Sequence, residues 1–343
     1  MTSRNKLAIA VIALIAAFSC RNEAPAPAPK PKLTKVSMNL NPVMTYAPLM
    51  IAMDEGFFTQ EGIEIEVAKL DSNSAIAATA AGKLDVLSAG VRSGVFNTIA
   101  RGVQMQVVAD KGHVHSGVCS ADAFIAPIAM ADRIAKNGGS LKGERIAILR
   151  GGLAEYLTTK LIESRGTTLE DVTIIQLPAG TPATTRTMAD AVRLTTEPNL
   201  SGIMHDGWAK VIATAQDIAP NHQFALLIFG RRLLKDEPQL GHRFMRAYLR
   251  GVKQYNLGKT DRNVAIIARH TKLDAEIIRR ACWVAVSDDA HIRPEAVQPF
   301  LDWAVETRLL DRPLKTEEWW NPSFLDAGLD AGLDKGLDTA QKQ

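Results

Sequence analysis

Arg150 is the residue whose position most clearly indicates binding chemistry. It directly follows an apolar segment, 145–149, that is predicted to be a strand, and Gly151 and Gly152 separate it from a helical pattern beginning at Ala154. A guanidinium at a strand end and the bare N–H groups of the next helix would point toward the same place. The combination is typical of an anion-binding turn. The alternative is a tight structural turn beside a solvated arginine, because a glycine pair alone is a weak motif.

Other polar side chains occupy similar positions after predicted strands. In open parallel sheets, ligands bind outside the carboxyl ends of the strands. Arg92 is a second candidate cation, and Tyr46 either stacks on a flat ligand or forms a core edge. Glu197 either faces the ligand or caps the turn before Pro198. The candidate ligand-binding residues are Asn41, Thr45, Tyr46, Ser88, Arg92, His115, Arg150, Gly151, Gly152, Thr181 and Glu197.

Histidine and cysteine are too sparse to predict a metal centre. His113 and His115 form a loop pair without a clear third ligand, and no Cys-x-x-Cys or Cys/His zinc spacing occurs. We therefore expect no metal and no cofactor. Cys119 and Cys282 are interpreted as two isolated core cysteines, although the sequence leaves a disulfide between them open.

The elements that must position these residues alternate between strands and helices. The first series predicts strands over 34–40, 63–70, 85–89 and 103–109, and helices over 48–53, 74–81 and 93–101. After a break at 111–117, the second series predicts strands over 145–149, 172–177, 191–196 and 224–229, and helices over 154–165 and 184–188. Such alternation indicates right-handed crossovers and parallel sheets. Residues 238–310 predict helices only.

Length and composition are consistent with two α/β lobes. The chain has 343 residues, of which 46% are hydrophobic, which is enough for two domains or one large bilobed domain. Disorder and a polytopic membrane protein are excluded. The net charge is only +3, and cationic clusters are pairs such as Arg231 and Arg232, so we expect no nucleic acid partner.

The N-terminus is typical of an exported protein. Arg4 and Lys6 precede an apolar segment, 7–18, that is too short to span a membrane. The segment ends in Ser19-Cys20, which resembles the lipobox of bacterial lipoproteins, with Cys20 as the acylated residue. The family pattern prefers leucine at the position of Ala17, so cleavage elsewhere with an unlipidated Cys20 is the alternative. We expect a signal peptide over 1–20, a Pro/Ala tether over 21–32, and a periplasmic protein anchored to a membrane through Cys20.

Several motifs resemble those of the solute-binding proteins of ABC importers for nitrate, sulfonates, taurine and thiamine precursors. They are YAPLMIAMDEGFFTQEGIEIEV at 46–67, AAGKLDVLSAG at 80–90, RGVQMQVVAD at 101–110, LKGERIAI at 141–148 and DVTIIQLPAG at 171–180. The resemblance covers nearly all of residues 33–329. It is weakest in the second lobe, where Met188-Ala189 stands in place of a usual glycine and Arg193 interrupts an apolar run.

The resemblance implies an α/β fold of the type II periplasmic binding protein kind. Each of two lobes would be a parallel-rich sheet flanked by helices, with two crossovers near 117–126 and 222–229 and with the C-terminal helices packed on lobe one. The implied boundaries are 33–117 and 229–325 for lobe one, 118–228 for lobe two, and 326–343 for a low-complexity tail.

The implied function is binding without catalysis. The ligand would be a small organic solute, either a sulfonate-like anion or a pyrimidine-like heterocycle, captured between the lobes by a monomer and delivered to an ABC permease and its ATPase. One alternative is an enzyme of the thiamine-pyrimidine-synthase type on the same fold. Those synthases carry a cysteine-rich iron motif, which the separated Cys119 and Cys282 could not reproduce. The other alternative is a ligand-sensing subunit of a membrane receptor.

Overall fold

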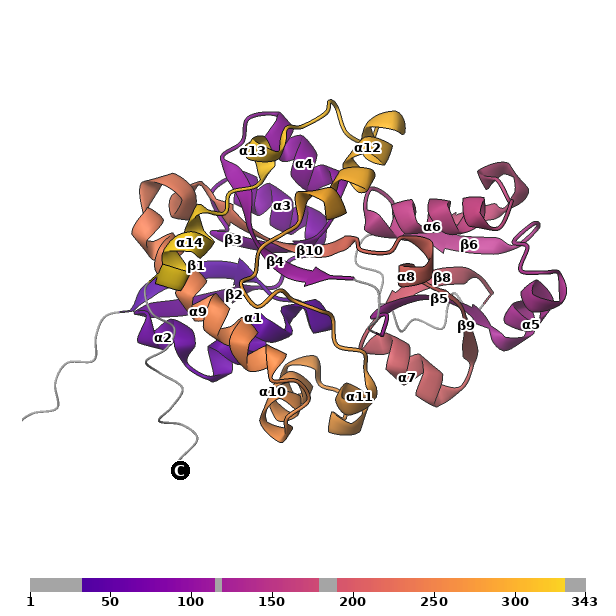
Figure 1. Ribbon diagram of the computed structural model, residues 1–343, viewed down its shortest axis with the longest axis horizontal. Helices are drawn as coiled ribbons and strands as arrows, with labels where there is room; N and C mark the ends of the chain where they lie inside the picture. The colour runs from indigo at the N-terminus through magenta and orange to yellow at the C-terminus, as the bar shows by residue number, and fades with distance from the viewer. Residues whose placement is uncertain (1–32, 115–118, 179–189, 331–343) are drawn as a thin grey trace, which may run out of the picture. The chain divides into compact units, whose positions relative to one another are not determined.

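Two five-stranded sheets, each flanked by helices, form the part of the chain that the structure describes (Figure 1). The structure is a computed structural model that describes residues 33–114, 119–178 and 190–330. The predicted signal peptide, Cys20, the tether, His115, Thr181 and the predicted helix 184–188 lie outside these residues. No helix within them combines the length and the apolar character needed to cross a membrane.

The first sheet has the strand order β2-β1-β3-β10-β4. Its strands are β1 (Thr34–Asn39), β2 (Ile63–Ala68), β3 (Val86–Gly90), β4 (Met105–His113) and β10 (Gln223–Gly230), and the helices that follow its strands are α1 (Ala47–Asp54), α2 (Phe57–Gln60), α3 (Ser72–Ala80) and α4 (Ser93–Ala100). β1 is parallel to β2 and β3, whereas β10 is antiparallel to β3 and β4. We call this sheet and its helices lobe one.

The second sheet has the order β7-β6-β8-β5-β9 and forms lobe two. Its strands are β5 (Asp122–Pro127), β6 (Arg145–Ile148), β7 (Thr173–Gln176), β8 (Val192–Thr196) and β9 (Ala209–Thr214), and its helices are α5 (Ile128–Lys136), α6 (Leu153–Ser164), α7 (Asn199–Asp206) and α8 (Ala215–Ile218). β6 is parallel to β7 and β8, and β5 is antiparallel to β8 and β9. The parallel-rich, two-sheet α/β fold predicted from the sequence is thereby confirmed.

In each lobe an antiparallel strand begins at the edge where the parallel strands end. In lobe one, Ala225 near the start of β10 pairs with Gly90, the last residue of β3. In lobe two, Asp122, the first residue of β5, pairs with Thr196, the last residue of β8. The first residues of β5 and β10 therefore lie at the edges where ligands bind to such sheets.

The second crossover differs from the sequence expectation. Because β10 belongs to the first sheet, the chain returns to lobe one between the end of α8 at Ile218 and Gln223, and not within 222–229. Residues up to 228 therefore do not all belong to lobe two. The predicted break at 111–117 also begins too early, since β4 continues through His113 and Lys111 is buried within it.

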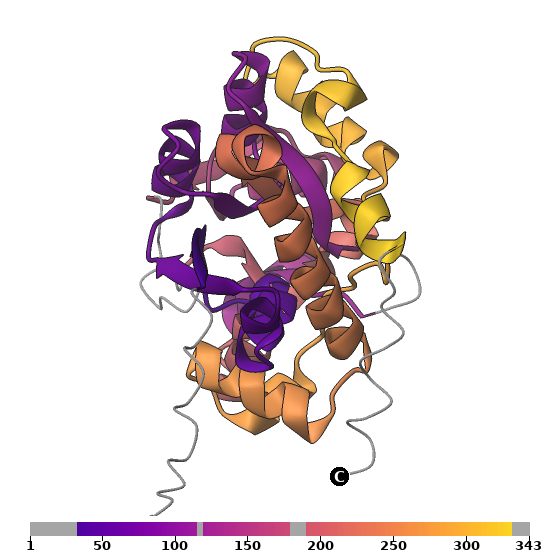
Figure 2. The same ribbon diagram turned by 90° about the vertical axis from the view of Figure 1, so that its left-hand side faces the viewer.

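The C-terminal helices were expected on lobe one, and most pack there. They are α9 (Pro238–Asn256), α10 (Asp261–Thr271), α11 (Ala275–Arg280), α12 (Gln298–Glu306), α13 (Thr316–Trp319) and α14 (Ser323–Asp330). Figure 2 shows the long α9 lying along lobe one, with α10 and α11 near its C-terminal end. Gly251 permits the close contact of α9 with α1, because a Cβ there would clash with the Pro48 carbonyl oxygen.

Helix α12 packs on both lobes, and α11 also contacts α7 of lobe two. The ring of Phe300 lies 6.3 Å from that of Phe96 in α4 and 6.2 Å from that of Tyr156 in α6. Trp303 packs edge-on against Tyr156 at 5.5 Å. One buried apolar cluster therefore runs from lobe one through α12 into lobe two.

Cys119 and Cys282 form a disulfide, so the interpretation of two isolated core cysteines is wrong. Cys119 lies in the first crossover, and Cys282 follows α11. The two residues are 163 positions apart in the sequence, and only the fold brings their Cα atoms to 5.8 Å, a distance that a disulfide can bridge.

Candidate functional site

A cavity of about 210 Å³ lies between the two lobes, and residues of both lobes line it. Lobe one contributes Ser72, Gly90, Val91, Arg92 and Phe224, and lobe two contributes Leu149, Arg150, Gly152, Leu153, Ala154, Leu194 and Thr196. Concave sites of this kind, apolar with a few polar groups, are where proteins hold small organic molecules.

Backbone hydrogen bonds between the lobes border this cavity. The Ser93 N–H donates to the Gly151 carbonyl oxygen at 2.9 Å, and the Leu153 N–H donates to the Val91 carbonyl oxygen at 2.9 Å. Gly152 lies at the same contact, where a Cβ would be 3.3 Å from the Cβ of Arg92. The glycine pair thus lets the lobes approach each other closely.

Arg150 lines the cavity, but its charge is already paired. Its Nη1 lies 2.5 Å from Oε1 of Glu155, and Oε2 of Glu155 accepts a hydrogen bond from the Gly151 N–H at 2.7 Å. Since the Leu153 N–H is bonded to Val91, the helix start offers an anion few free donors. These contacts favour the alternative interpretation, a structural turn.

Arg92 is the cation that stays available to a ligand. It is the residue before α4, it is only half-buried, and it lines the cavity. Within residues 33–114, 119–178 and 190–330, its guanidinium has no hydrogen bond or ion pair. Burial lowers its pKa, and the charge of Asp71 partly opposes that effect. An arginine nevertheless stays protonated in proteins, so Arg92 brings to the cavity a positive charge that forms no ion pair with any residue that the structure describes.

Four predicted residues meet at the carboxyl edge of the first sheet in a buried network. The Tyr46 hydroxyl donates to the Ser88 carbonyl oxygen at 2.6 Å and accepts from Asn41 Nδ2 at 3.3 Å. Lys111 Nζ donates to Thr45 Oγ1 at 3.0 Å and lies 3.7 Å from the Tyr46 ring centroid. Burial raises the pKa of Tyr46 to about 12 and lowers that of Lys111. Because Tyr46 is buried and Lys111 covers one face of its ring, the ring is a support and not an open stacking surface.

Glu197 caps a helix and links the lobes. Its Oε2 accepts from the Ser201 N–H in α7 at 2.9 Å, and its Oε1 accepts from the Cys282 N–H at 3.1 Å. Cys282 is part of the C-terminal segment on lobe one, so this carboxylate connects lobe two to lobe one on the side of the disulfide. Glu197 is absent from the cavity lining.

Sequence reasoning missed Phe224 and Asp122 at this edge. Phe224 lines the cavity, and Asp122 supports it indirectly, since Oδ1 of Asp122 accepts a 2.6 Å hydrogen bond from the hydroxyl of the lining residue Thr196. Burial raises the pKa of Asp122 to about 7, and the nearby charge of Glu197 adds to the effect. Both residues were missed because the sequence analysis considered only residues that follow strands. β5 and β10 are antiparallel to their neighbours, so they begin at the edge of the sheet where the parallel strands end.

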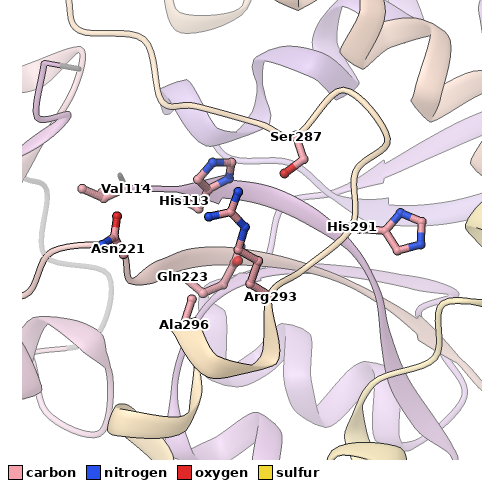
Figure 3. Close-up of a pocket in the computed structure, with 8 residues that line it drawn as sticks. All are labelled: His113, Val114, Asn221, Gln223, Ser287, His291, Arg293 and Ala296. Carbon is pink, nitrogen blue, oxygen red and sulfur yellow. The ribbon is translucent and has the colours of Figure 1, made fainter. Parts of the chain in front are cut away.

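A second, much smaller pocket lies beside the crossovers. Figure 3 shows its lining, in which the Arg293 side chain points toward His113 while His291 lies apart. His113 Nδ1 lies 2.7 Å from Asp110 Oδ2, and Gln223 Nε2 donates to Asp110 Oδ1 at 2.8 Å. The pocket has a volume of about 20 Å³, which is enough for a water molecule and too small for an organic ligand. We therefore interpret the hydrogen bonds among His113, Asp110 and Gln223 as structural contacts that hold the crossovers in place. Among the residues described, no three His, Cys, Asp or Glu side chains are placed to hold a metal ion.

Comparison with solved structures identifies the same fold. A ligand-binding component of an ABC-type import system from Staphylococcus aureus has a TM-score of 0.71 and 17% identity, covering 85% of this chain and 98% of that one. The alkanesulfonate-binding protein of Xanthomonas axonopodis pv. citri has a TM-score of 0.63 and 18% identity, covering 86% and 100%. A mutant of the desulfurization enzyme DSZB in complex with biphenyl-2-sulfinic acid has a TM-score of 0.61 and 15% identity, covering 87% and 99%.

The fold is therefore shared by binding proteins and by an enzyme. No curated protein sequence matches the chain. Residues 43–256 match the family model described as NMT1/THI5 like, and this range includes strands of both sheets and all of the residues that line the cavity. The family resemblance seen in the sequence motifs is confirmed, and the chain belongs to the NMT1/THI5-like family.

Proposed function

We propose that this protein is the solute-binding component of an ABC-type importer. It captures a small organic anion between its lobes and delivers it to a permease driven by an ATPase. The observation that carries the proposal is Arg92, which lines a cavity between two lobes and whose guanidinium forms no hydrogen bond or ion pair with the described residues. The structural neighbours named as import-system and alkanesulfonate-binding proteins support this assignment.

The cavity lining favours an anion with an apolar part. Arg150 is neutralised by Glu155, so Arg92 supplies the remaining charge. Most other lining side chains are apolar, including Leu149, Leu153, Leu194 and Phe224. A sulfonate or carboxylate on a short carbon skeleton fits this combination better than a pyrimidine-like heterocycle, because Tyr46 is buried and offers no open ring face.

Binding is proposed over catalysis because of the disulfide. Cys119 and Cys282 are bonded to each other, so neither sulfur is a thiol that could act as a nucleophile or ligate a metal. The desulfurization enzyme of the same fold makes catalysis the alternative. The test is to incubate the protein for a long time with a small acid that it binds. Recovery of the acid unchanged supports binding, whereas a new product identifies an enzyme.

We also propose that the protein is a monomer in the periplasm, held to a membrane by a lipid on Cys20. The apolar segment 7–18, the Ser19-Cys20 pair and the Pro/Ala-rich 21–32 support this. Fractionation of cells that express Cys20→Ala tests the anchor. Release of the variant from membranes into the soluble periplasmic fraction is the expected result, and unchanged fractionation contradicts lipidation.

Thermal unfolding with a panel of small acids tests the binding function. A ligand at ~100 times its Kd stabilises a protein by ~2.7 kcal/mol, which is a clear shift in melting temperature. We expect stabilisation by at least one short-chain sulfonate or carboxylate. Stabilisation only by uncharged heterocycles would contradict the anion assignment. A genomic neighbourhood with a permease and an ATPase would support transport over sensing.

A further inference from the structure

Helix α12 is anchored to lobe one on both sides in the sequence. Before the helix, the Ala290 carbonyl oxygen accepts a hydrogen bond from the Asp110 N–H in β4 at 2.7 Å. After the helix, Asn97 of α4 donates to the Leu309 carbonyl oxygen at 2.7 Å and accepts from the Asp311 N–H at 2.9 Å. These hydrogen bonds make α12 a part of lobe one, so we expect it to stay with that lobe when the lobes move apart.

The contact of α12 with lobe two is apolar and centres on Tyr156 of α6, the helix that lies beside α12 (Figure 1). The Tyr156 ring packs edge-on against Phe300 at 6.2 Å and against Trp303 at 5.5 Å. None of the three side chains is more than 7% exposed. The Tyr156 hydroxyl forms no hydrogen bond with the residues that the structure describes, so the ring itself makes the contact.

Tyr156 lies in the same helical turn as part of the cavity lining. α6 begins at Leu153, and the residues before and after it, Gly152 and Ala154, line the cavity with it. The Tyr156 N–H donates to the Gly152 carbonyl oxygen at 3.2 Å, and the Leu153 N–H donates to Val91 of lobe one. Because a hydrogen-bonded helical turn moves as a unit, a movement that separates this turn from lobe one also pulls Tyr156 away from α12.

We propose that Tyr156, Phe300 and Trp303 form a clasp that holds the two lobes together in the absence of a ligand. Opening the clasp exposes buried aromatic rings to water, which costs free energy. Arg92 opposes closure, because its charge is half-buried without a partner among the described residues, and the clasp offsets this cost.

A contact that exists in only one of two conformations shifts the population toward that conformation. Most ligand-free molecules are therefore closed, and a solute enters through a minority of open molecules. This inference concerns the protein without its ligand, so it goes beyond the proposed function and does not depend on which solute binds.

Distances between two spin labels in the ligand-free protein test the clasp. The labels are attached to Glu317→Cys on α13 of lobe one and Glu163→Cys on α6 of lobe two, two exposed positions on helices near α12. Bound solutes are first removed by unfolding in guanidinium without a reducing agent and refolding. Pulsed electron paramagnetic resonance then gives the fraction of molecules at the label separation expected from the closed structure. The otherwise unchanged protein should be mainly closed, and a mainly open population overturns the proposal.

Variants show whether the aromatic contact is responsible for closure. Tyr156→Ala should lower the ratio of closed to open molecules at least about 10-fold, because burial of one large apolar side chain contributes about that factor or more. Adding Trp303→Ala should lower the ratio further. Tyr156→Phe should keep the wild-type ratio, since it removes only the hydroxyl. Trp208→Ala is the matched control, because Trp208 is a partly buried aromatic residue that packs in a cluster of lobe two alone, and it should also keep the ratio.

Chemical denaturation of each variant ensures that a misfolded protein is not mistaken for an open one. If Tyr156→Ala does not unfold cooperatively, Tyr156→Leu takes its place, since leucine keeps apolar volume but loses the edge-on ring contacts, and it should show a smaller fall in the ratio. A wild-type ratio in every folded variant of Tyr156 and Trp303 overturns the clasp and makes α12 a pivot on which the lobes turn. Failure of the acid panel to bind would remove the proposed function without changing any of these ratios.

Discussion

Arg150 and Glu155 form an ion pair at the turn where lobe two meets lobe one, with 2.5 Å between Nη1 and Oε1. The side chain of Glu155 is nearly buried and also accepts the Gly151 N–H, so the carboxylate holds the glycine turn in shape. Arg150 acts as the counter-charge of this carboxylate. The two arginines of the cavity therefore have different roles, although their sequence contexts are alike.

The first prediction separates these roles. Arg92→Ala should weaken the binding of an acidic ligand roughly 10- to 150-fold, because a hydrogen bond to a charged group contributes ~1.5 to 3 kcal/mol. Its unfolding free energy should barely change. Arg150→Ala should instead lower the unfolding free energy by about 1 kcal/mol or more, since it leaves the nearly buried Glu155 carboxylate without its counter-charge. Calorimetry and chemical denaturation measure the two quantities, and a large affinity loss for Arg150→Ala alone would reverse the assignment.

The second prediction concerns closure of the lobes. In Gly152→Val, the new side chain would press on Arg92, whose Cβ lies 3.3 Å from the position of a Cβ at residue 152. The backbone hydrogen bonds that border the cavity should be lost, and affinity for the ligand should fall by at least tenfold without unfolding. Gly202→Ala in α7 is the control, because a Cβ there meets nothing within 4 Å. Small-angle scattering with saturating ligand should show a more open Gly152→Val protein, and equal closure of both variants would contradict the prediction.

The sequence predicted the first sheet well because its strands have clear patterns. β1 and β2 were found within two residues of their expected ends, since each follows an alternating apolar pattern bounded by glycine or polar residues. β5 and β9 were missed. β5 begins with a charged residue and ends in a proline, features that sequence rules assign to loops, but Asp122 is paired with Thr196 and Pro127 lies at the strand end.

The position of the candidate site could be predicted from the sequence, but the charge state of its lining could not. The strand-end rule placed Arg92 and Arg150 at one cavity, because parallel strands end at a common edge. The rule could not show that Glu155 would neutralise Arg150, because that depends on one side chain folding back over the turn. The disulfide was equally hidden, since a separation of 163 residues carries no information about distance.

The third prediction concerns the disulfide. Cys119 and Cys282 join the first crossover to the segment whose Cys282 N–H also binds Glu197. The Cys119→Ser, Cys282→Ser double variant should lose about 2 to 5 kcal/mol of unfolding free energy, as expected for a crosslink that closes a long loop. Reduced wild-type protein should match the double variant in denaturation. The reducing agent should leave the double variant itself unchanged, and stability of the wild type that is insensitive to reduction would exclude the bond.

The fourth prediction follows from the raised pKa of Asp122. In the folded protein the pKa of Asp122 is about 7, against an ordinary value of 3.8 for an aspartate side chain. Between these two values the folded state binds a proton that the unfolded state has lost, so ionisation of Asp122 removes stability as pH rises from about 4 to 7. Asp122→Asn removes this term. The unfolding free energy of the variant minus that of the wild type should therefore increase across this window and stay constant above it.

The measurement is chemical denaturation of both proteins at a series of pH values. Taking the difference cancels the other titrating groups except Glu197, which is close enough to Asp122 to be coupled to it. Across this pH window, the difference in unfolding free energy should rise by no more than about 4 kcal/mol, at 1.36 kcal/mol per pKa unit. A weaker hydrogen bond to Thr196 in the variant offsets part of this rise. A difference that is independent of pH would show that Asp122 titrates normally. A difference that decreases with rising pH would mean that the folded protein favours the ionised carboxylate, and the assignment of a raised pKa to Asp122 would then be wrong.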